Sequence, residues 1–144
     1  MCHETGALFV VNDRADIALL LDAGLHIGQD DLSPLDARSL MRPHRVLGFS
    51  THNEFQLRAA LKEPADYLAI GPVFGTASKN NADPVVGLEE LRRLRTLTDG
   101  PLAAIGGITR ENAALVYAAG ADSIAVIGDL VPNPRARAEE WLRF

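Results

Sequence analysis

The sequence is poor in cysteine and in aromatic residues. Cys2 is the only cysteine of the 144 residues, which excludes an internal disulfide framework. Aromatic residues make up 6% of the chain. No apolar run reaches the ~20 residues that a membrane-spanning helix needs, and no basic and then apolar leader opens the chain. We therefore expect a cytoplasmic protein with no membrane partner.

Excess positive charge is also absent, because the formal net charge is -5 at pH 7. This balance argues against a nucleic-acid partner. The four histidines do not have the spacing of a zinc site. No Gly-x-Gly-x-x-Gly motif follows the first expected strand, which weakens the case for a dinucleotide-binding protein.

What the chain does have is a repeated pattern of short apolar runs and amphipathic stretches. Runs rich in Val, Ile and Leu predict six strands, buried on both faces, at 8–11, 25–28, 45–50, 67–73, 102–106 and 123–128. Apolar spacings of three and four predict helices at 13–22, 33–41, 53–62, 88–97, 110–119 and 134–143. Ser33 before Pro34 is typical of a helix start, and Thr109 is a further candidate cap.

Strands that alternate with helices predict right-handed parallel β-α units in one domain over residues 1–144. Two architectures fit this pattern, a doubly wound sheet and a (β/α)8 TIM-type barrel. Units of uniform length and polar residues after nearly every strand favour the barrel. Only about six β-α units can be counted, whereas such a barrel has eight units and commonly ~250 residues. We therefore expect an incomplete barrel.

The longest connection follows the fourth expected strand. Gly71 and Pro72 end that strand, and the loop from Phe74 to Val86 exceeds the normal size of a β-α connection. The loop carries Thr76, Ser78 and Lys79. An ammonium and two hydroxyls at the carboxyl end of a strand suit an anionic substrate, and long loops are often functional. An ordinary surface loop is the alternative.

Carboxylates follow the first two expected strands. Asp13 and Asp31 stand at the ends of neighbouring strands, which lie ~4.8 Å apart in a parallel sheet. Mg²⁺ is commonly bound by one or two carboxylates together with substrate phosphates, so these residues are candidate metal ligands. Capping of a helix by Asp13, or of a turn by Asp30 or Asp31, is the alternative interpretation.

Glycines end the last two expected strands, at Gly106-Gly107 and at Gly128. Barrels often bind phosphate on backbone N–H groups at these positions, although plain turn chemistry also uses glycine. His52 opens a helix just past a strand end and is either a general base or a capping residue. His26 lies inside a strand, where a hydrogen-bonded structural role is expected.

Several segments together resemble the thiamine-phosphate synthase family, and they run in family order across nearly the whole chain. They are Val11-Asn-Asp-Arg14, His26-Ile-Gly-Gln-Asp-Asp31, Gly48-Phe-Ser-Thr-His52, Gly71-Pro-Val-Phe-Gly-Thr-Ala-Ser-Lys79, Ile105-Gly-Gly-Ile-Thr109, Ala119-Gly-Ala-Asp122 and Val126-Ile-Gly128. The resemblance implies a (β/α)8 barrel that joins a hydroxymethylpyrimidine diphosphate to a thiazole phosphate, or to its carboxylated precursor. The products would be thiamine phosphate and pyrophosphate.

The resemblance also implies roles for individual residues. Lys79 and Ser50 would be catalytic, and Asp13 and Asp31 would bind Mg²⁺. The pyrimidine diphosphate would contact Asn12, Ser50 and Lys79. The thiazole phosphate would contact a second group, made of Thr76, Ser78, Gly107, Ile127 and Gly128.

Three departures from the family pattern bear on these roles. The first two β-α units and their Gln-x-Arg-x-Lys strand have no counterpart in the 144 residues, so we expect the chain alone to fold poorly unless a partner or second copy covers its edges. Ser78 replaces the usual threonine. Gly128 replaces a common serine, and Asp129 adds a carboxylate beside the expected phosphate. A thiazole tautomerase that uses His52, or an inactive binding module, remains an alternative.

Overall fold

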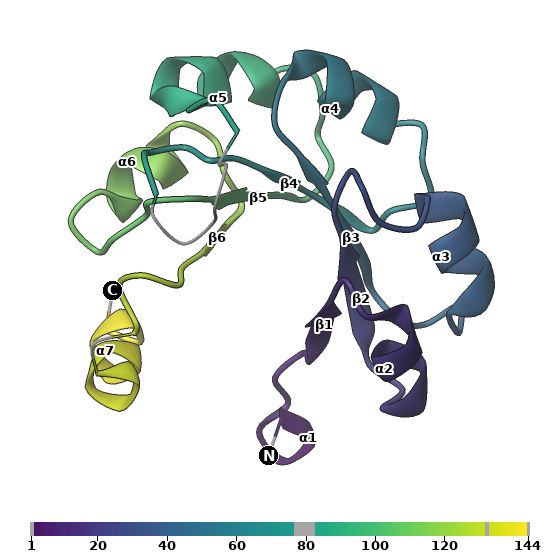
Figure 1. Cartoon of the computed structure of the whole chain (residues 1–144). Helices are drawn as coiled ribbons and strands as arrows, with labels where there is room; N and C mark the ends of the chain where they lie inside the picture. Colours follow the sequence, from purple (N-terminus) through teal and green to yellow (C-terminus); the bar gives the residue numbers. More distant parts are fainter. Residues whose placement is uncertain (1, 77–82, 132, 144) are drawn as a thin grey trace.

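The structure is a computed structural model that describes residues 2–76, 83–131 and 133–143. Its centre is a single sheet of six parallel strands arranged in chain order. The strands are β1 (Val10–Asn12), β2 (Gly24–Ile27), β3 (Leu47–Thr51), β4 (Tyr67–Ile70), β5 (Leu102–Ile105) and β6 (Ser123–Ala125). Figure 1 shows the sheet curling, with helices along its outer side.

Helices connect the strands, as the sequence predicts. They are α2 (Ala15–Leu20), α3 (Pro34–Leu40), α4 (Glu54–Ala60), α5 (Gly87–Arg95), α6 (Ala113–Ala118) and α7 (Pro134–Trp141). The bounds differ from the predicted ones by a few residues. A four-residue helix before the first strand, α1 (Cys2–Thr5), was not predicted, because four residues carry no apolar period.

Ser33 caps α3 as predicted, since its hydroxyl accepts the backbone N–H of Asp36 at 3.1 Å. The prediction for Thr109 is wrong. The N-cap residue of α6 is Asn112, and its side-chain oxygen accepts the N–H of Thr109 at 2.9 Å. The Asn112 amide nitrogen also donates to the carbonyl of Gly107 at 3.1 Å. The Asn112 side chain therefore stabilises the loop between β5 and α6 through these two hydrogen bonds.

The strand order decides between the two predicted architectures. A doubly wound sheet reverses its strand order at a switch point, whereas here each strand pairs with the next one from β1 to β6. In the described ranges β1 pairs only with β2, and β6 only with β5. The fold is therefore a curled half-barrel of six β-α units, of the TIM-barrel type.

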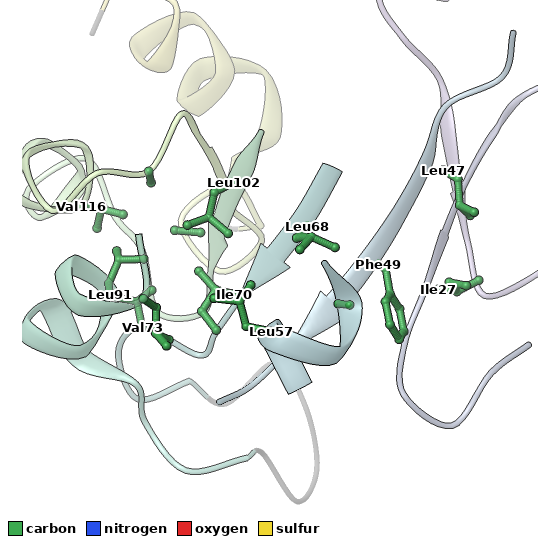
Figure 2. Packing of buried hydrophobic residues seen from close by; sticks show 14 of the residues in the cluster. Ile27, Leu47, Phe49, Leu57, Leu68, Ile70, Val73, Leu91, Leu102 and Val116 are labelled. Atoms are coloured by element: carbon green, nitrogen blue, oxygen red, sulfur yellow. The ribbon is translucent and has the colours of Figure 1, made fainter. Parts of the chain in front are cut away.

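The apolar core lies between the outer face of the sheet and the helices (Figure 2). Fully buried strand residues include Leu25, Leu47 and Ile70, and they pack with the helix residues Leu57 and Leu91. Alternate residues of each strand supply this layer, because successive side chains point to opposite faces. The prediction of strands buried on both faces agrees with β2, β3 and β4, in each of which all but one residue is buried. The inner positions of these strands are occupied by small and polar residues.

Two aspartates stabilise the amino ends of neighbouring strands by the same pair of contacts, a hydrogen bond from a backbone N–H and an ion pair with an arginine. Asp66, before β4, accepts the N–H of Leu47 at 2.7 Å and pairs with Arg38. Asp122, before β6, accepts the N–H of Leu102 at 2.8 Å and likewise pairs with an arginine of a preceding helix. The repeated turn sequence before these strands therefore has a structural role at the edge opposite the candidate site.

No helix in the described part of the chain is long and apolar enough to cross a membrane.

Candidate active site

The inner face of the half-barrel carries most of the polar residues of the strands; the buried Thr51 of β3 lies on the outer face, in register with Ile70. Strand register places Asn12, His26, Gly48 and Tyr67 in one row across β1 to β4. Partners in a parallel sheet present their side chains on the same face, so this row lines the inner surface. Ser50 follows two residues after Gly48, on the same face and nearer the carboxyl end. The row forms the floor of the candidate site.

His26, Tyr67 and Ser50 are joined by hydrogen bonds across three strands. The Nδ1 atom of His26 lies 2.8 Å from the Tyr67 hydroxyl, and Nε2 lies 2.8 Å from the Ser50 hydroxyl. The two rings stack with centroids 5.5 Å apart. Because His26 engages both ring nitrogens, the prediction of a hydrogen-bonded structural histidine agrees with these contacts, and Ser50 is held in one orientation.

Gly48 makes room for this arrangement. A Cβ atom at position 48 would lie 2.1 Å from Cζ of Tyr67 and 2.4 Å from Nδ1 of His26. No side chain fits there without displacing one ring. The glycine lets residues on β2 and β4 meet across the intervening strand.

Burial sets the protonation of this cluster. Desolvation lowers the pKa of His26 below 6.5, and the charge of Asp31 opposes that shift only in part. Desolvation likewise raises the pKa of Tyr67 above 10. Both groups are therefore neutral near pH 7, and the neutral imidazole can donate to one hydroxyl while it accepts from the other.

Asn12 and Asp13 stand exposed at the carboxyl end of β1. The backbone of Asp13 has φ of 63°, a left-handed conformation that few non-glycine residues adopt. The N-cap position of α2 is Arg14, so Asp13 does not occupy the capping position considered as the alternative. Asp22 has the same type of conformation, with φ of 48°, so this backbone geometry alone does not assign a role to Asp13.

Asp31 is exposed after β2 and also closes a turn. Its Oδ2 atom accepts the backbone N–H of Gly28 at 2.7 Å, in agreement with the turn interpretation. The neighbouring Gln29 donates its side-chain amide to the carbonyl of Ser50 at 2.6 Å and ties the ends of β2 and β3 together. The described residues contain no group of three or more acidic, histidine or cysteine residues arranged for a metal.

Only the two ends of the long loop after β4 lie within the described residues. The peptide bond between Gly71 and Pro72 is cis. Thr76 is partly exposed, whereas Ser78 and Lys79 lie outside the described residues. The two described ends meet, because the N–H of Val86 donates to the carbonyl of Pro72 at 2.8 Å. The loop therefore leaves and returns at one point of the site.

Gly106 and Gly107 have φ of 97° and 62°, and they pack against this loop. A Cβ at Gly107 would lie 2.5 Å from the carbonyl oxygen of Gly75, and one at Gly106 would lie 2.5 Å from Cα of Pro72. Close approach of the two loops thus explains both glycines, as the turn interpretation allows. Beyond β6, Ile127 is 55% exposed and Gly128 is also exposed, so this corner is accessible to a ligand.

His52 links the end of β3 to both ends of the long loop. Its Nδ1 atom lies 2.6 Å from the carbonyl oxygen of Gly71, and Nε2 lies 3.5 Å from Oδ2 of Asp83. The side chain is only 16% exposed. Both ring nitrogens of His52 therefore contact the long loop, which indicates a structural role and leaves neither nitrogen accessible as a general acid or base.

The family model for thiamine monophosphate synthase matches residues 1–130 of the chain. The chain belongs to this family. It is 58% identical over 136 residues to the thiamine-phosphate synthase of Koribacter versatilis, covering 94% of the chain and 64% of the relative. It is 46% identical over 132 residues to that of Moorella thermoacetica, covering 91% and 63%. The chain thus spans somewhat under two thirds of the length of these relatives.

A solved structure from the same family has the same fold. The thiamine phosphate pyrophosphorylase from Pyrococcus furiosus superposes with a TM-score of 0.87 at 36% identity, over 99% of the chain and 69% of that protein. The resemblance inferred from the motifs is therefore confirmed. A more distant structure, titled native KDPGal, has a TM-score of 0.67 at 16% identity and shares the fold alone.

Within this family fold, sequence reasoning missed two features of the candidate site. It assigned no role to Tyr67, although Tyr67 contacts His26 directly. It treated Gly48 only as a motif residue. The apolar run around Tyr67 hides the inward tyrosine, and only the strand register shows that residues 26, 48 and 67 lie side by side.

Proposed function

We propose that the protein is a thiamine-phosphate synthase. It would join 4-amino-2-methyl-5-hydroxymethylpyrimidine diphosphate to thiazole phosphate, or to carboxythiazole phosphate, and release pyrophosphate, together with carbon dioxide when the carboxythiazole phosphate is the substrate. Family membership supports the activity class. The single structural observation that carries the proposal is the hydrogen-bonded row of polar residues on the inner face, which opens toward the carboxyl ends of the strands where barrels hold their active sites.

The pyrimidine would bind over this row. Ser50 and Asn12 would offer hydrogen bonds to the aminopyrimidine. His26 and Tyr67 would hold the Ser50 hydroxyl in place through the two 2.8 Å contacts of His26. A neutral His26 keeps this region free of charge, which suits an uncharged heterocycle. Orientation of the reacting carbon is the main contribution of these residues.

The diphosphate would lie at the ends of β1 and β2. Asp13 and Asp31 fit a Mg²⁺ ion, because this ion takes only one or two carboxylates and completes its shell with water and phosphate oxygens. When bound, the ion would neutralise charge that develops on the departing pyrophosphate. Lys79, on the loop after β4, would contribute a second positive charge to the same group.

The thiazole phosphate would lie on the other side, toward β5 and β6. Thr76 and Ser78 would offer hydroxyls, and Gly107 and Gly128 would offer backbone N–H groups. Ile127, which is 55% exposed, would cover the thiazole ring. The two substrates would then meet above the ends of β3 and β4.

The reaction itself requires no strong base. The bond between the pyrimidine CH₂ carbon and the diphosphate oxygen breaks, and the electron pair leaves with pyrophosphate. The thiazole nitrogen then donates its lone pair to the same carbon. Positioning and charge stabilisation supply the rate enhancement, so Lys79 and Ser50 are the residues expected to act on the reacting group.

The tautomerase alternative would need His52 as an acid or base. That residue has little exposure, and its Nδ1 is engaged by the carbonyl of Gly71. This geometry disfavours the tautomerase. An inactive binding module would bind ligands without turnover. A homo-oligomer, in which a second copy covers the open edges of the sheet, is one alternative that stays a prediction.

The test is pyrophosphate release by the encoded protein, meaning the 144 residues with any residues that the reading frame adds. We expect release only when both substrates and Mg²⁺ are present. Release that needs the pyrimidine diphosphate alone would contradict a synthase. Isomerisation of carboxythiazole phosphate without pyrophosphate release would favour the tautomerase.

A further inference from the structure

Asp129 creates an electrostatic problem at the proposed thiazole-phosphate site. Its carboxylate follows Gly128 directly, where a phosphate would meet a like charge. The Asp129 side chain is only 14% exposed. Its Oδ2 atom accepts the indole N–H of Trp141, from the C-terminal helix α7, at 2.9 Å. This contact fixes the carboxylate against α7.

Arg110 faces the same carboxylate from the neighbouring loop. It lies between β5 and α6, three residues after Gly107, and its Nε atom is 3.8 Å from Oδ2 of Asp129. Its Nη2 atom pairs with Oε2 of Glu140 at 2.8 Å. The guanidinium therefore connects the loop after β5, the loop after β6 and α7, which lies beyond β6 in the chain (Figure 1).

One donor of Arg110 is left over. Its Nε atom is buried and has no hydrogen-bond acceptor among the described residues, since 3.8 Å is too long for a hydrogen bond. Buried N–H groups are normally paired, so an orphaned one calls for an explanation. The Asp129 carboxylate is its nearest charged partner, and the exposed 33% of the Arg110 side chain is the part that a ligand can reach.

The charges around Arg110 balance before any ligand binds. Arg110 and Arg137 are positive, Asp129 and Glu140 are negative, and Arg137 pairs with Glu140 at 3.1 Å. The cluster thus offers no net repulsion to an anion, in spite of Asp129. Strands β5 and β6 pair in register at Ile105 and Ala125, so the loops that carry Gly107 and Gly128 start side by side.

We propose that Arg110 binds the phosphate monoester group of the thiazole substrate, while Asp129 and Glu140 act as its positioning residues. This inference rests on the proposed function and adds the cation of the phosphate site, which backbone N–H groups alone do not supply. An arginine suits this role because its planar fork contacts two phosphate oxygens at once.

The experiment compares Arg110→Gln and Arg110→Lys in the encoded protein. Arg135→Gln is the matched control, because Arg135 lies on α7, is 93% exposed and pairs with Glu139 at 3.3 Å. Calorimetry measures binding of the thiazole phosphate and of the corresponding thiazole alcohol. Steady-state kinetics measures KM for each substrate. Thermal melting reports whether each variant folds.

We expect Arg110→Gln to weaken thiazole-phosphate binding at least tenfold and to remove the preference over the alcohol. The KM for the pyrimidine diphosphate should stay within twofold of the parent protein. Arg110→Lys should be intermediate, because it keeps the charge and loses the fork. Arg135→Gln should match the parent protein.

An unchanged preference for the phosphate in Arg110→Gln overturns the inference, as does an equal rise in both KM values. If Arg110→Gln does not fold, a preference in Arg110→Lys equal to that of the parent overturns it. Equal binding of the thiazole phosphate and the thiazole alcohol by the parent protein also overturns the inference. If the parent releases no pyrophosphate, the proposed function fails, while the calorimetric comparison still decides the role of Arg110.

Discussion

Replacement of Gly48 by alanine tests the hydrogen-bonded row at the floor of the site. The added Cβ would lie 2.1 Å from Cζ of Tyr67 and 2.4 Å from both Oη of Tyr67 and Nδ1 of His26. Because real Cβ atoms do not approach other atoms so closely, at least one ring must move. The contact between His26 and Tyr67 should break, and Ser50 should lose its fixed orientation.

The magnitude follows from two contributions. Overpacking of a tight site costs about 1–3 kcal/mol. Loss of one hydrogen bond in a partly buried setting costs about 1 kcal/mol. We therefore expect Gly48→Ala to lower the free energy of unfolding by about 2–4 kcal/mol. Urea denaturation followed by circular dichroism measures this change, and an unchanged m-value would show that the extent of unfolding is the same.

Two further variants make the experiment specific. Gly75→Ala is the matched control, because a Cβ at Gly75 would meet nothing within 4 Å. In a Tyr67→Leu background the phenol is gone, so the cost of Gly48→Ala should shrink by more than half. Equal destabilisation by Gly48→Ala and Gly75→Ala would refute the reasoning. An undiminished cost in the Tyr67→Leu background would do so as well.

Three further predictions concern the metal, the loop and pH. Asp31→Asn keeps an oxygen for the Gly28 N–H but removes the charge, so Mg²⁺-dependent activity should fall at least tenfold, about 1.4 kcal/mol; unchanged activity with unchanged Mg²⁺ dependence would leave Asp31 only its turn. Lys79→Ala should impair use of the pyrimidine diphosphate more than use of the thiazole phosphate, and Thr76→Ala should do the reverse; equal losses would indicate a general role of the loop. Burial lowers the pKa of His26 below 6.5, so the unfolded chain binds a proton more readily. The free energy of unfolding should therefore fall as pH decreases from about 6.5 toward that lowered pKa, and His26→Gln should flatten this slope in urea titrations; an equal slope in both proteins would assign it to other groups.

The order and type of the six β-α units could be predicted from the sequence. Each unit consists of an apolar run followed by a stretch with helical spacing of apolar residues. Both patterns can be recognised from neighbouring residues alone, without knowledge of the fold. The bounds were less predictable. The strand expected at 45–50 is observed at Leu47–Thr51, because pairing with the neighbouring strands fixes where a strand begins and ends.

Candidate site residues could be predicted near the carboxyl ends of strands. Asn12 ends β1 and Asp31 lies in the loop after β2, whereas Tyr67 was missed because it begins β4 and acts through the inner face. The contact between His26 and Tyr67 joins residues 41 positions apart and depends on the glycine between them. The environment of Asp129 is likewise set by Trp141, from a different element. Such long-range contacts leave no local pattern.

Formation of thiamine phosphate from the two substrates is the measurement that tests the central claim most directly. Mass spectrometry quantifies thiamine phosphate while an enzymatic assay quantifies pyrophosphate, both with the encoded protein, with Ser50→Ala and with Ser39→Ala. Ser39 is an exposed control on α3 whose hydroxyl donates to the carbonyl of Asp36 at 2.7 Å. We predict equal amounts of both products, a large loss in Ser50→Ala and none in Ser39→Ala. Pyrophosphate without thiamine phosphate, or full activity in Ser50→Ala, would contradict the account.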